Sequence, residues 1–205
     1  LLAPKTIVVI KSTVLPGTTE RLQKKFPKLT VLHSPEFLTK KTAAHDASYP
    51  ERNIVGIPKN SPKYKRCAKE VLAVLPNAPF ELVCSSNEAE LLKYASNVFG
   101  YTKVIFMNLL YDISQTQNTR WDVLKSAMAA DSKIGTWHLD PVHKGGRGAG
   151  GICLIKDFEA FRKFYMKNVS DKKGHMVFDA LLEKNIQLLK KSNKDKHILK
   201  DVYGG

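Results

Sequence analysis

The sequence is poor in acidic residues and contains no long apolar run. It has 205 residues, with 33 Lys and Arg against 19 Asp and Glu. No run approaches the roughly 20 apolar residues that cross a bilayer, and residues 1–5 lack the pattern of a signal peptide. We therefore expect a cytoplasmic protein with no membrane partner. Because 43% of the residues are hydrophobic, the chain can bury a core.

Cysteine is also scarce. Cys67, Cys84 and Cys153 are odd in number and far apart, with no CxxC pair. This pattern predicts neither a disulfide framework nor a zinc site, and no metal site is expected. A cysteine with a function in this chain therefore acts alone.

The formal net charge of +14 raises the possibility of a nucleic-acid partner. Many basic residues, however, lie on amphipathic stretches such as 63–69 and 184–200, which are typical of solvated helix faces. A basic surface also suits a small anion such as a nucleotide diphosphate. Nucleic acid is the less favoured partner, and a non-catalytic dimerisation or nucleic-acid-binding protein remains an alternative.

The first half of the chain alternates strand and helix patterns. Short β-branched or apolar runs predict strands over 6–10, 29–32, 53–57 and 80–84. Turn and capping residues predict helices over 18–26 and 62–75. Alternating strands and helices indicate a parallel sheet of the α/β class.

The second half is predicted to be all-α. Helices are expected over 88–116, 119–130, 157–166 and 175–192. The glycine-rich segment 135–151 between them predicts a loop. A G-x-G-x-x-G turn, which opens dinucleotide-binding domains, does not occur near the N-terminus, so we expect the chain to begin within such a domain.

The segment from Gly148 to Asp157 has the strongest chemical signal. Gly148, Gly150 and Gly151 precede Cys153, and glycines let a backbone approach a ligand closely. A lysine three residues later and a helix start expected at Asp157 favour a thiolate nucleophile. A buried cysteine beside a flexible hinge is an equally good interpretation of these residues.

Two weaker patterns lie elsewhere. On the expected helix 88–116, Glu90, Lys93 and Asn97 share one polar face. The lysine and the amide could hold a substrate oxygen or a water, although an ordinary solvent stripe is favoured. Ser12 and Thr13 follow one expected strand and Ser34–Leu38 another, at the sheet edge where such folds bind ligands. Each of these two segments is a weak signal alone, because a carboxylate such as Glu36 after a proline at a strand end is more often part of a turn or a cap than a general base.

Taken in order, these segments resemble the UDP-glucose/GDP-mannose dehydrogenase family. The matching segments are Ser12–Val14, Pro35–Leu38, Pro50–Gly56, Glu90–Asn97 and Gly150–Asp157. The resemblance implies that 1–86 is the C-terminal half of a Rossmann-like NAD-binding domain. It implies that 87–205 is a helical central domain, which forms a homodimer through its long helix.

The resemblance also implies a reaction with NAD as cofactor. UDP-glucose would be oxidised twice at C6 to UDP-glucuronate, a precursor for polysaccharide biosynthesis, through a cysteine thiohemiacetal and then a thioester. GDP-mannose or a UDP-N-acetylhexosamine is the alternative substrate. The chain lacks both the glycine-rich turn and a third domain, so we expect it to be inactive alone.

The implied residue roles follow the matching positions. Cys153 is the nucleophile, Lys93 stabilises the oxyanion, and Asn97, Asp157, Thr13 and Glu36 manage the catalytic water and its protons. The residues implied to bind the cofactor are Ser12, Thr13, Glu36 and Lys156. Those implied to bind the substrate are Phe37, Leu38, Lys93, Asn97, Lys133, Gly148, Gly150 and Gly151.

Several positions depart from the family pattern. Lys133 stands where an arginine commonly reaches the partner subunit's sugar, and a lysine cannot form the same two-pronged contact. Ala149 replaces an aromatic residue of the glycine loop, and Lys40 replaces a small or acidic residue. These changes predict that the affinity for the nucleotide sugar, or the choice of sugar, differs from that of other family members.

Overall fold

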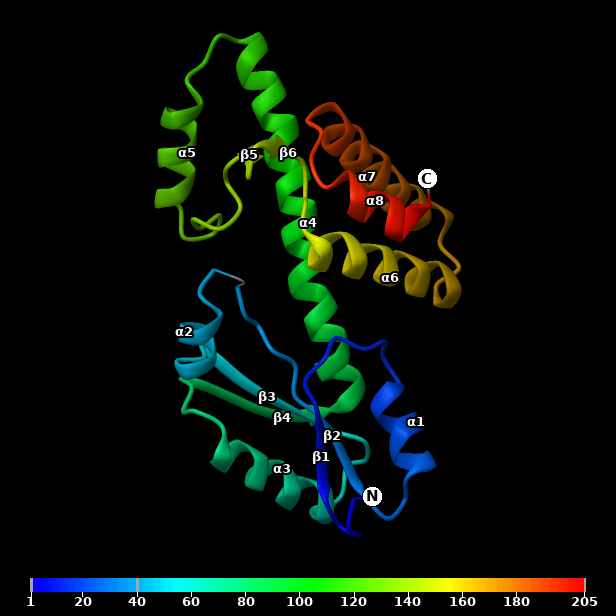
Figure 1. Ribbon diagram of the computed structural model, residues 1–205. Coiled ribbons are helices and arrows are strands. Elements are labelled where there is room, and N and C mark those ends of the chain that lie inside the picture. The colour runs from blue at the N-terminus through cyan, green and yellow to red at the C-terminus, as the bar shows by residue number, and fades with distance from the viewer. Residues whose placement is uncertain (1, 40, 205) are drawn as a thin grey trace. The chain divides into compact units, whose positions relative to one another are not determined.

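The computed structural model describes residues 2–39 and 41–204, so the expectation for Lys40 lies outside the described residues. The chain folds as two compact units, Leu1–Ala95 and Ser96–Gly205 (Figure 1). The long helix α4 (Ser86–Thr116) begins in the first unit and continues in the second. Each unit has its own core.

The first unit is an α/β structure with a four-stranded sheet. Its elements are β1 (Ile7–Ile10), α1 (Thr18–Lys25), β2 (Thr30–His33), α2 (Ala43–Ser48), β3 (Arg52–Ile57), α3 (Pro62–Val74) and β4 (Phe80–Ser85). The strand order is β1-β2-β3-β4, and the pairs β1/β2 and β3/β4 are parallel. The expected parallel α/β arrangement is thus confirmed within both pairs.

The join between the two strand pairs differs from that expectation. The single residue pair His33 and Gly56 connects β2 to β3, and it is antiparallel. Figure 1 shows β3 and β4 running across the ends of β1 and β2. Both members of the bridging pair lie near the carboxyl ends of their strands, so the ends of β2 and β3 meet there.

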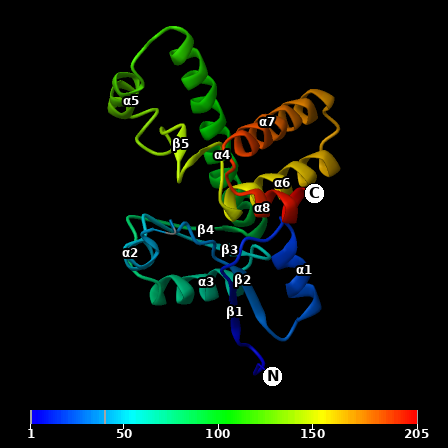
Figure 2. The same cartoon turned by 45° about the horizontal axis from the view of Figure 1, so that its top comes forward.

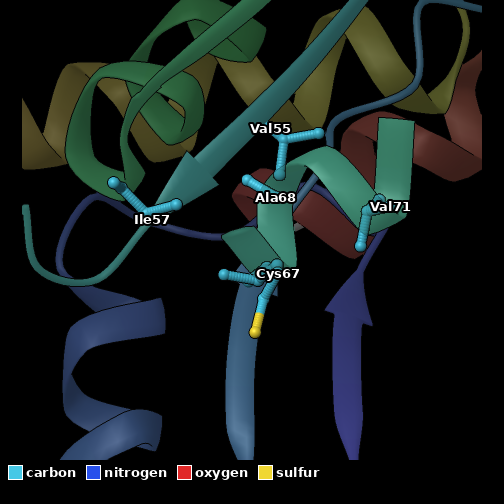
Figure 3. Packing of buried hydrophobic residues seen from close by; sticks show 6 residues of the cluster. Val55, Ile57, Cys67, Ala68 and Val71 are labelled. Carbon is cyan, nitrogen blue, oxygen red and sulfur yellow. The ribbon is translucent and has the colours of Figure 1, made fainter. Parts of the chain in front are cut away.

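The two faces of the sheet bury different side chains. Because successive residues of a strand point to opposite faces, Ile7 and Val9 pack toward α3. Val8 and Ile10 line an apolar hollow with residues of α1. On the α3 side the core consists of Leu32, Val55, Ile57, Cys67, Ala68 and Val71 (Figure 3).

The start of α4 packs directly against the sheet of the first unit. A Cβ atom at Gly56 would lie 2.7 Å from Cβ of Ala89 and 2.8 Å from Cα of Ser86, so only glycine allows this approach. One turn further, the fully buried Glu90 carboxylate accepts from the backbone N–H of Gly17 (2.7 Å) and of Thr19 (2.8 Å). It also accepts from the Thr19 hydroxyl at 2.6 Å. Glu90 therefore caps α1.

The second unit is helical apart from one short hairpin. After the remainder of α4 come α5 (Trp121–Ala130), β5 (Val142–His143), β6 (Gly146–Arg147), α6 (Ile152–Asn168), α7 (Lys172–Lys191) and α8 (Lys196–Tyr203). Helices α6, α7 and α8 lie side by side in Figures 1 and 2. Their core contains Ile155, Leu189, Ile198 and Leu199. Tyr101 of α4 stacks on Phe158 of α6, with ring centroids 3.8 Å apart.

Two local expectations were wrong, and two helices were missed. Helix α6 begins at Ile152, five residues before Asp157, so Cys153 lies in its first turn and not on a preceding loop. The segment expected to be a loop, 135–151, contains the hairpin of β5 and β6. Helices α2 and α8 were not predicted. Among the described helices, none is both long and apolar enough to cross a membrane.

The Glu90 cap gives the first prediction. Glu90→Ala leaves two N–H groups and a buried hydroxyl without their acceptor, at about 1–3 kcal/mol for each unsatisfied group. We expect a clear loss of unfolding free energy in urea denaturation, with Glu90→Gln intermediate because it keeps one acceptor. Glu81→Ala is the control, because Glu81 is exposed on β4 and should change stability by less than about 0.5 kcal/mol. Equal urea midpoints for the wild-type protein and all variants would contradict the proposed role of Glu90 as a helix cap.

Candidate functional site

In the first unit, polar side chains gather where β1 and β2 end. Lys11, directly after β1, donates to the Ser34 hydroxyl at 3.3 Å and lies 3.9 Å from the Glu36 carboxylate. Burial lowers the pKa of Lys11, while the charge of Glu36 opposes that shift. Ser12 is exposed and Thr13 half-buried in the segment that follows Lys11. The structure thus brings together the two strand ends that the sequence singled out.

Lys93 belongs to this cluster. Its ammonium donates to the backbone carbonyl of Glu36 at 2.7 Å and lies 5.4 Å from the ring centroid of Phe37. The guanidinium of Arg52 stacks on the same ring at 3.9 Å. Leu38 follows in an exposed position. Lys93 is therefore fixed beside the segment after β2, and Arg52 is a neighbour that the sequence did not single out for a role.

The residues present fit part of a dinucleotide. The hydroxyls of Ser12 and Thr13, at the carboxyl edge of a parallel strand pair, suit a ribose or an amide. The N-terminus of α1 does not suit a pyrophosphate, because the Glu90 carboxylate already occupies its N–H groups. This edge can thus contact NAD through its hydroxyls, but it does not offer a phosphate cradle at α1.

In the second unit, a buried carboxylate connects α4 to α6. Asp157 is 1% exposed, and its Oδ2 accepts from the side-chain amide of Asn97 at 2.5 Å. Its other oxygen, Oδ1, accepts from Lys156, whose side chain is half exposed. Asp157 is therefore in direct contact with Asn97, which was implied to share its role at the catalytic water, and with Lys156, which was implied to bind the cofactor.

Cys153 is one helical turn before Asp157 on α6, and its side chain is exposed. Residues four apart on a helix share a face, so the thiol and the carboxylate lie on the same side of α6. Cys67 is buried in the first unit. Burial, with the nearby charge of Glu88, raises the pKa of the half-buried Cys84 to about 11. All three thiols are free, and only Cys153 is exposed.

The glycine loop before Cys153 is held by residues that the sequence did not reveal. Asn185 of α7 binds both the N–H and the carbonyl of Ala149, at 2.7 and 3.0 Å. Lys194 donates to the carbonyl of Gly148, and Asp195 accepts from the N–H of Gly151. No local pattern signals these contacts, because their partners lie 36–46 residues apart.

The predicted catalytic residues are divided between the two units. Thr13, Glu36 and Lys93 lie in the first, whereas Asn97, Cys153 and Asp157 lie in the second. Lys133 is exposed in the turn after α5, where its backbone N–H donates to Asp131 at 2.9 Å. The implied roles require Cys153 to meet Lys93 and Asn97 at one reacting carbon, and this meeting stays a prediction. Within residues 2–39 and 41–204, no group of three or more His, Cys, Asp or Glu is arranged to hold a metal ion.

Two family models match the chain in order. The NAD binding domain of the UDP-glucose/GDP-mannose dehydrogenase family matches residues 1–75, and the central domain of the same family matches residues 87–185. A UDP-glucose 6-dehydrogenase of Rickettsia bellii is 30% identical over 184 residues, which is 87% of this chain and 40% of that protein. An uncharacterised protein of Methanocaldococcus jannaschii is 36% identical over 156 residues, 74% of this chain and 17% of that protein.

Solved structures give the same result. A UDP-glucose dehydrogenase from Pyrobaculum islandicum superimposes with a TM-score of 0.74 and 31% identity, over 97% of this chain and 44% of that one. The chain thus spans less than half the length of these relatives. Because both domain models match, one after the other along the chain, the chain belongs to the UDP-glucose/GDP-mannose dehydrogenase family, a family of NAD-dependent nucleotide-sugar oxidoreductases.

Proposed function

We propose that this chain forms part of an enzyme that oxidises the C6 alcohol of UDP-glucose to the carboxylate of UDP-glucuronate. The observation that carries the proposal is the position of Cys153, exposed in the first turn of α6 and one turn from the buried Asp157. Relatives named UDP-glucose 6-dehydrogenase support UDP-glucose as the sugar. GDP-mannose and UDP-N-acetylhexosamines are the alternatives.

The proposed chemistry has two oxidations and one hydrolysis. The first oxidation converts the C6 alcohol to an aldehyde. The Cys153 sulfur adds to this aldehyde and forms a thiohemiacetal, and the second oxidation converts the thiohemiacetal to a thioester. Water then cleaves the thioester and releases the free thiol and the carboxylate. NAD, when bound, accepts a hydride in each oxidation.

The contacts around Asp157 support a role in the hydrolysis. A buried carboxylate held by an amide and an ammonium is fixed in place, so it can orient a water and receive its proton. In the first unit, Thr13 and Glu36 are proposed to act on the catalytic water and its protons, and Lys93 is the cation that stabilises the oxyanion. Phe37, Leu38, Lys133 and the loop glycines are proposed to contact the sugar nucleotide.

Turnover tests the substrate and the nucleophile together. In the complete enzyme of which this chain is proposed to form part, we expect NADH to form with UDP-glucose and not with GDP-mannose or UDP-N-acetylglucosamine, measured by absorbance. Cys153→Ala should lower the rate of UDP-glucuronate release by about 10⁴-fold or more, which is typical for loss of a nucleophile. Cys84→Ala is the matched control, because that thiol is half-buried and should leave turnover unchanged. Full activity of Cys153→Ala would rule out the mechanism.

Thiol reactivity gives a test that needs no turnover. Iodoacetamide reacts with the thiolate of an accessible cysteine. Because Cys153 is exposed and Cys67 is buried, Cys153 should be labelled well before Cys67. Because burial raises the pKa of Cys84 to about 11, its labelling should increase only as the pH rises toward that value. Peptide mass spectrometry follows each site, and addition of UDP-glucose should slow only Cys153. Labelling of Cys84 ahead of Cys153 at pH 7 would contradict this prediction.

We further propose that the chain forms a homodimer through α4. Phe99, Phe106 and Ile113 are 65%, 57% and 60% exposed, and Leu109 is 44% exposed. The first three are seven residues apart, so they form one apolar stripe on the second-unit part of the helix. Such a stripe favours pairing with a second copy.

A cytoplasmic location is also proposed, because reducing conditions there keep the Cys153 thiol free.

The stripe can be tested by molar mass. Burying a large apolar side chain contributes about 1.5–3 kcal/mol, so Phe106→Glu combined with Ile113→Glu should convert the dimer to a monomer. Light scattering after size exclusion measures the change. Val177→Glu is the control, because Val177 is equally exposed at 58% but lies on α7. A wild-type monomer, or a dimer that survives the double substitution, would refute the proposal.

A further inference from the structure

The segment 185–195 binds the backbone of the glycine loop almost residue by residue. We call Asn185, Ser192, Lys194 and Asp195 the backbone clamp. Together they form hydrogen bonds with the backbone of five of the six residues from Gly146 to Gly151. The loop leads directly into α6, whose second residue is Cys153.

Asn185 is the buried centre of the clamp. Its side chain is fully buried, and its oxygen accepts from the Ala149 N–H at 2.7 Å. Its nitrogen donates to the Ala149 carbonyl at 3.0 Å. An amide side chain that satisfies both polar groups of one residue fixes the orientation of that peptide. Ala149 itself is 1% exposed, so water cannot substitute for these bonds.

The turn after α7 supplies the other contacts. The ammonium of Lys194 donates to the carbonyl of Gly148 at 2.9 Å and to that of Gly146 at 3.4 Å. Burial lowers the pKa of Lys194, whereas the charge of Asp195 raises it. The Ser192 hydroxyl accepts from the N–H of Arg147 at 3.0 Å. The Asp195 carboxylate accepts from the N–H of Gly151 at 2.8 Å.

The clamp also explains two of the loop glycines. A Cβ atom at Gly148 would lie 2.9 Å from the Asn185 oxygen, and one at Gly150 would lie 2.2 Å from the Asp195 carboxylate. Gly148 and Gly151 adopt positive φ, where glycine is favoured. At Gly148 and Gly150 the close approach is therefore to residues of the same chain.

We propose that the backbone clamp is the positioning device for Cys153. Gly151 is the N-cap of α6 and has no side chain to cap the helix, so the Asp195 carboxylate performs part of that task from the turn after α7. By fixing 146–151, the clamp determines where the first turn of α6 begins. The clamp residues are positioning residues, and their importance for catalysis rests on the proposed function of Cys153.

Hydrogen exchange followed by mass spectrometry tests the clamp directly. In the wild-type protein, peptides covering 146–153 should exchange slowly. Asn185→Ala should speed exchange there by roughly tenfold or more, while peptides of β3 and α3 stay unchanged. Gln187→Ala is the matched control, because Gln187 is an exposed amide two residues away on α7. Unchanged exchange over 146–153 in Asn185→Ala would overturn the proposal.

A second pair of variants keeps the test valid if Asn185→Ala fails to fold. Asp195 is only half-buried, and Asp195→Ala removes its acceptor, whereas Asp195→Asn retains an acceptor oxygen. We expect faster exchange at Gly151 and altered iodoacetamide labelling of Cys153 in Asp195→Ala, with recovery in Asp195→Asn. Identical behaviour of the two variants would count against the clamp. Neither readout needs turnover, so a failure of UDP-glucose oxidation would leave this result intact and would reject only the proposed function.

Discussion

The arrangement of the second unit depends on the buried carboxylate of Asp157. An isolated charge that is 1% exposed would be strongly unfavourable, so its position requires the Asn97 amide and the Lys156 ammonium. The Asn97 contact ties α6 to α4 at one point. Since Cys153 is one turn away on the same helix, the bond that satisfies the carboxylate also determines where the thiol stands.

Much of the fold could be predicted from the sequence because its elements carry local signals. The β-branched run before Lys11 predicted β1, and Pro62 at the first helical position predicted the start of α3. The long uninterrupted pattern after Ser86 predicted α4, with only Gly100 inside it. Lys93, Asn97, Lys156 and Asp157 were identified as site residues through the family resemblance, and the structure places Asn97 and Lys156 in contact with Asp157.

Other features could not be predicted because their causes are distant in sequence. The start of α6 was missed since Ile152 and Leu154 are apolar and offer no cap, whereas Asp195 is 44 residues away. The six-residue helix α2 has no buried residue and so no apolar period to recognise. The antiparallel join depends on one residue pair. Glu90 looked like part of a polar face, but its carboxylate is fully buried against α1.

The same type of N-terminal contact occurs at two helices, one that follows proposed site residues and one that carries the proposed nucleophile. Helix α1 follows Ser12 and Thr13 and begins after Gly17, and α6 carries Cys153 and begins after Gly151; both N-cap glycines have positive φ. A glycine cannot cap a helix with its own side chain, so in each case a carboxylate from elsewhere in the same unit accepts from the glycine N–H. Gly151, which the family resemblance implies as a substrate contact, is therefore also a docking point for one of the chain's own carboxylates. The geometry around the proposed nucleophile is in this way set by a turn more than forty residues later.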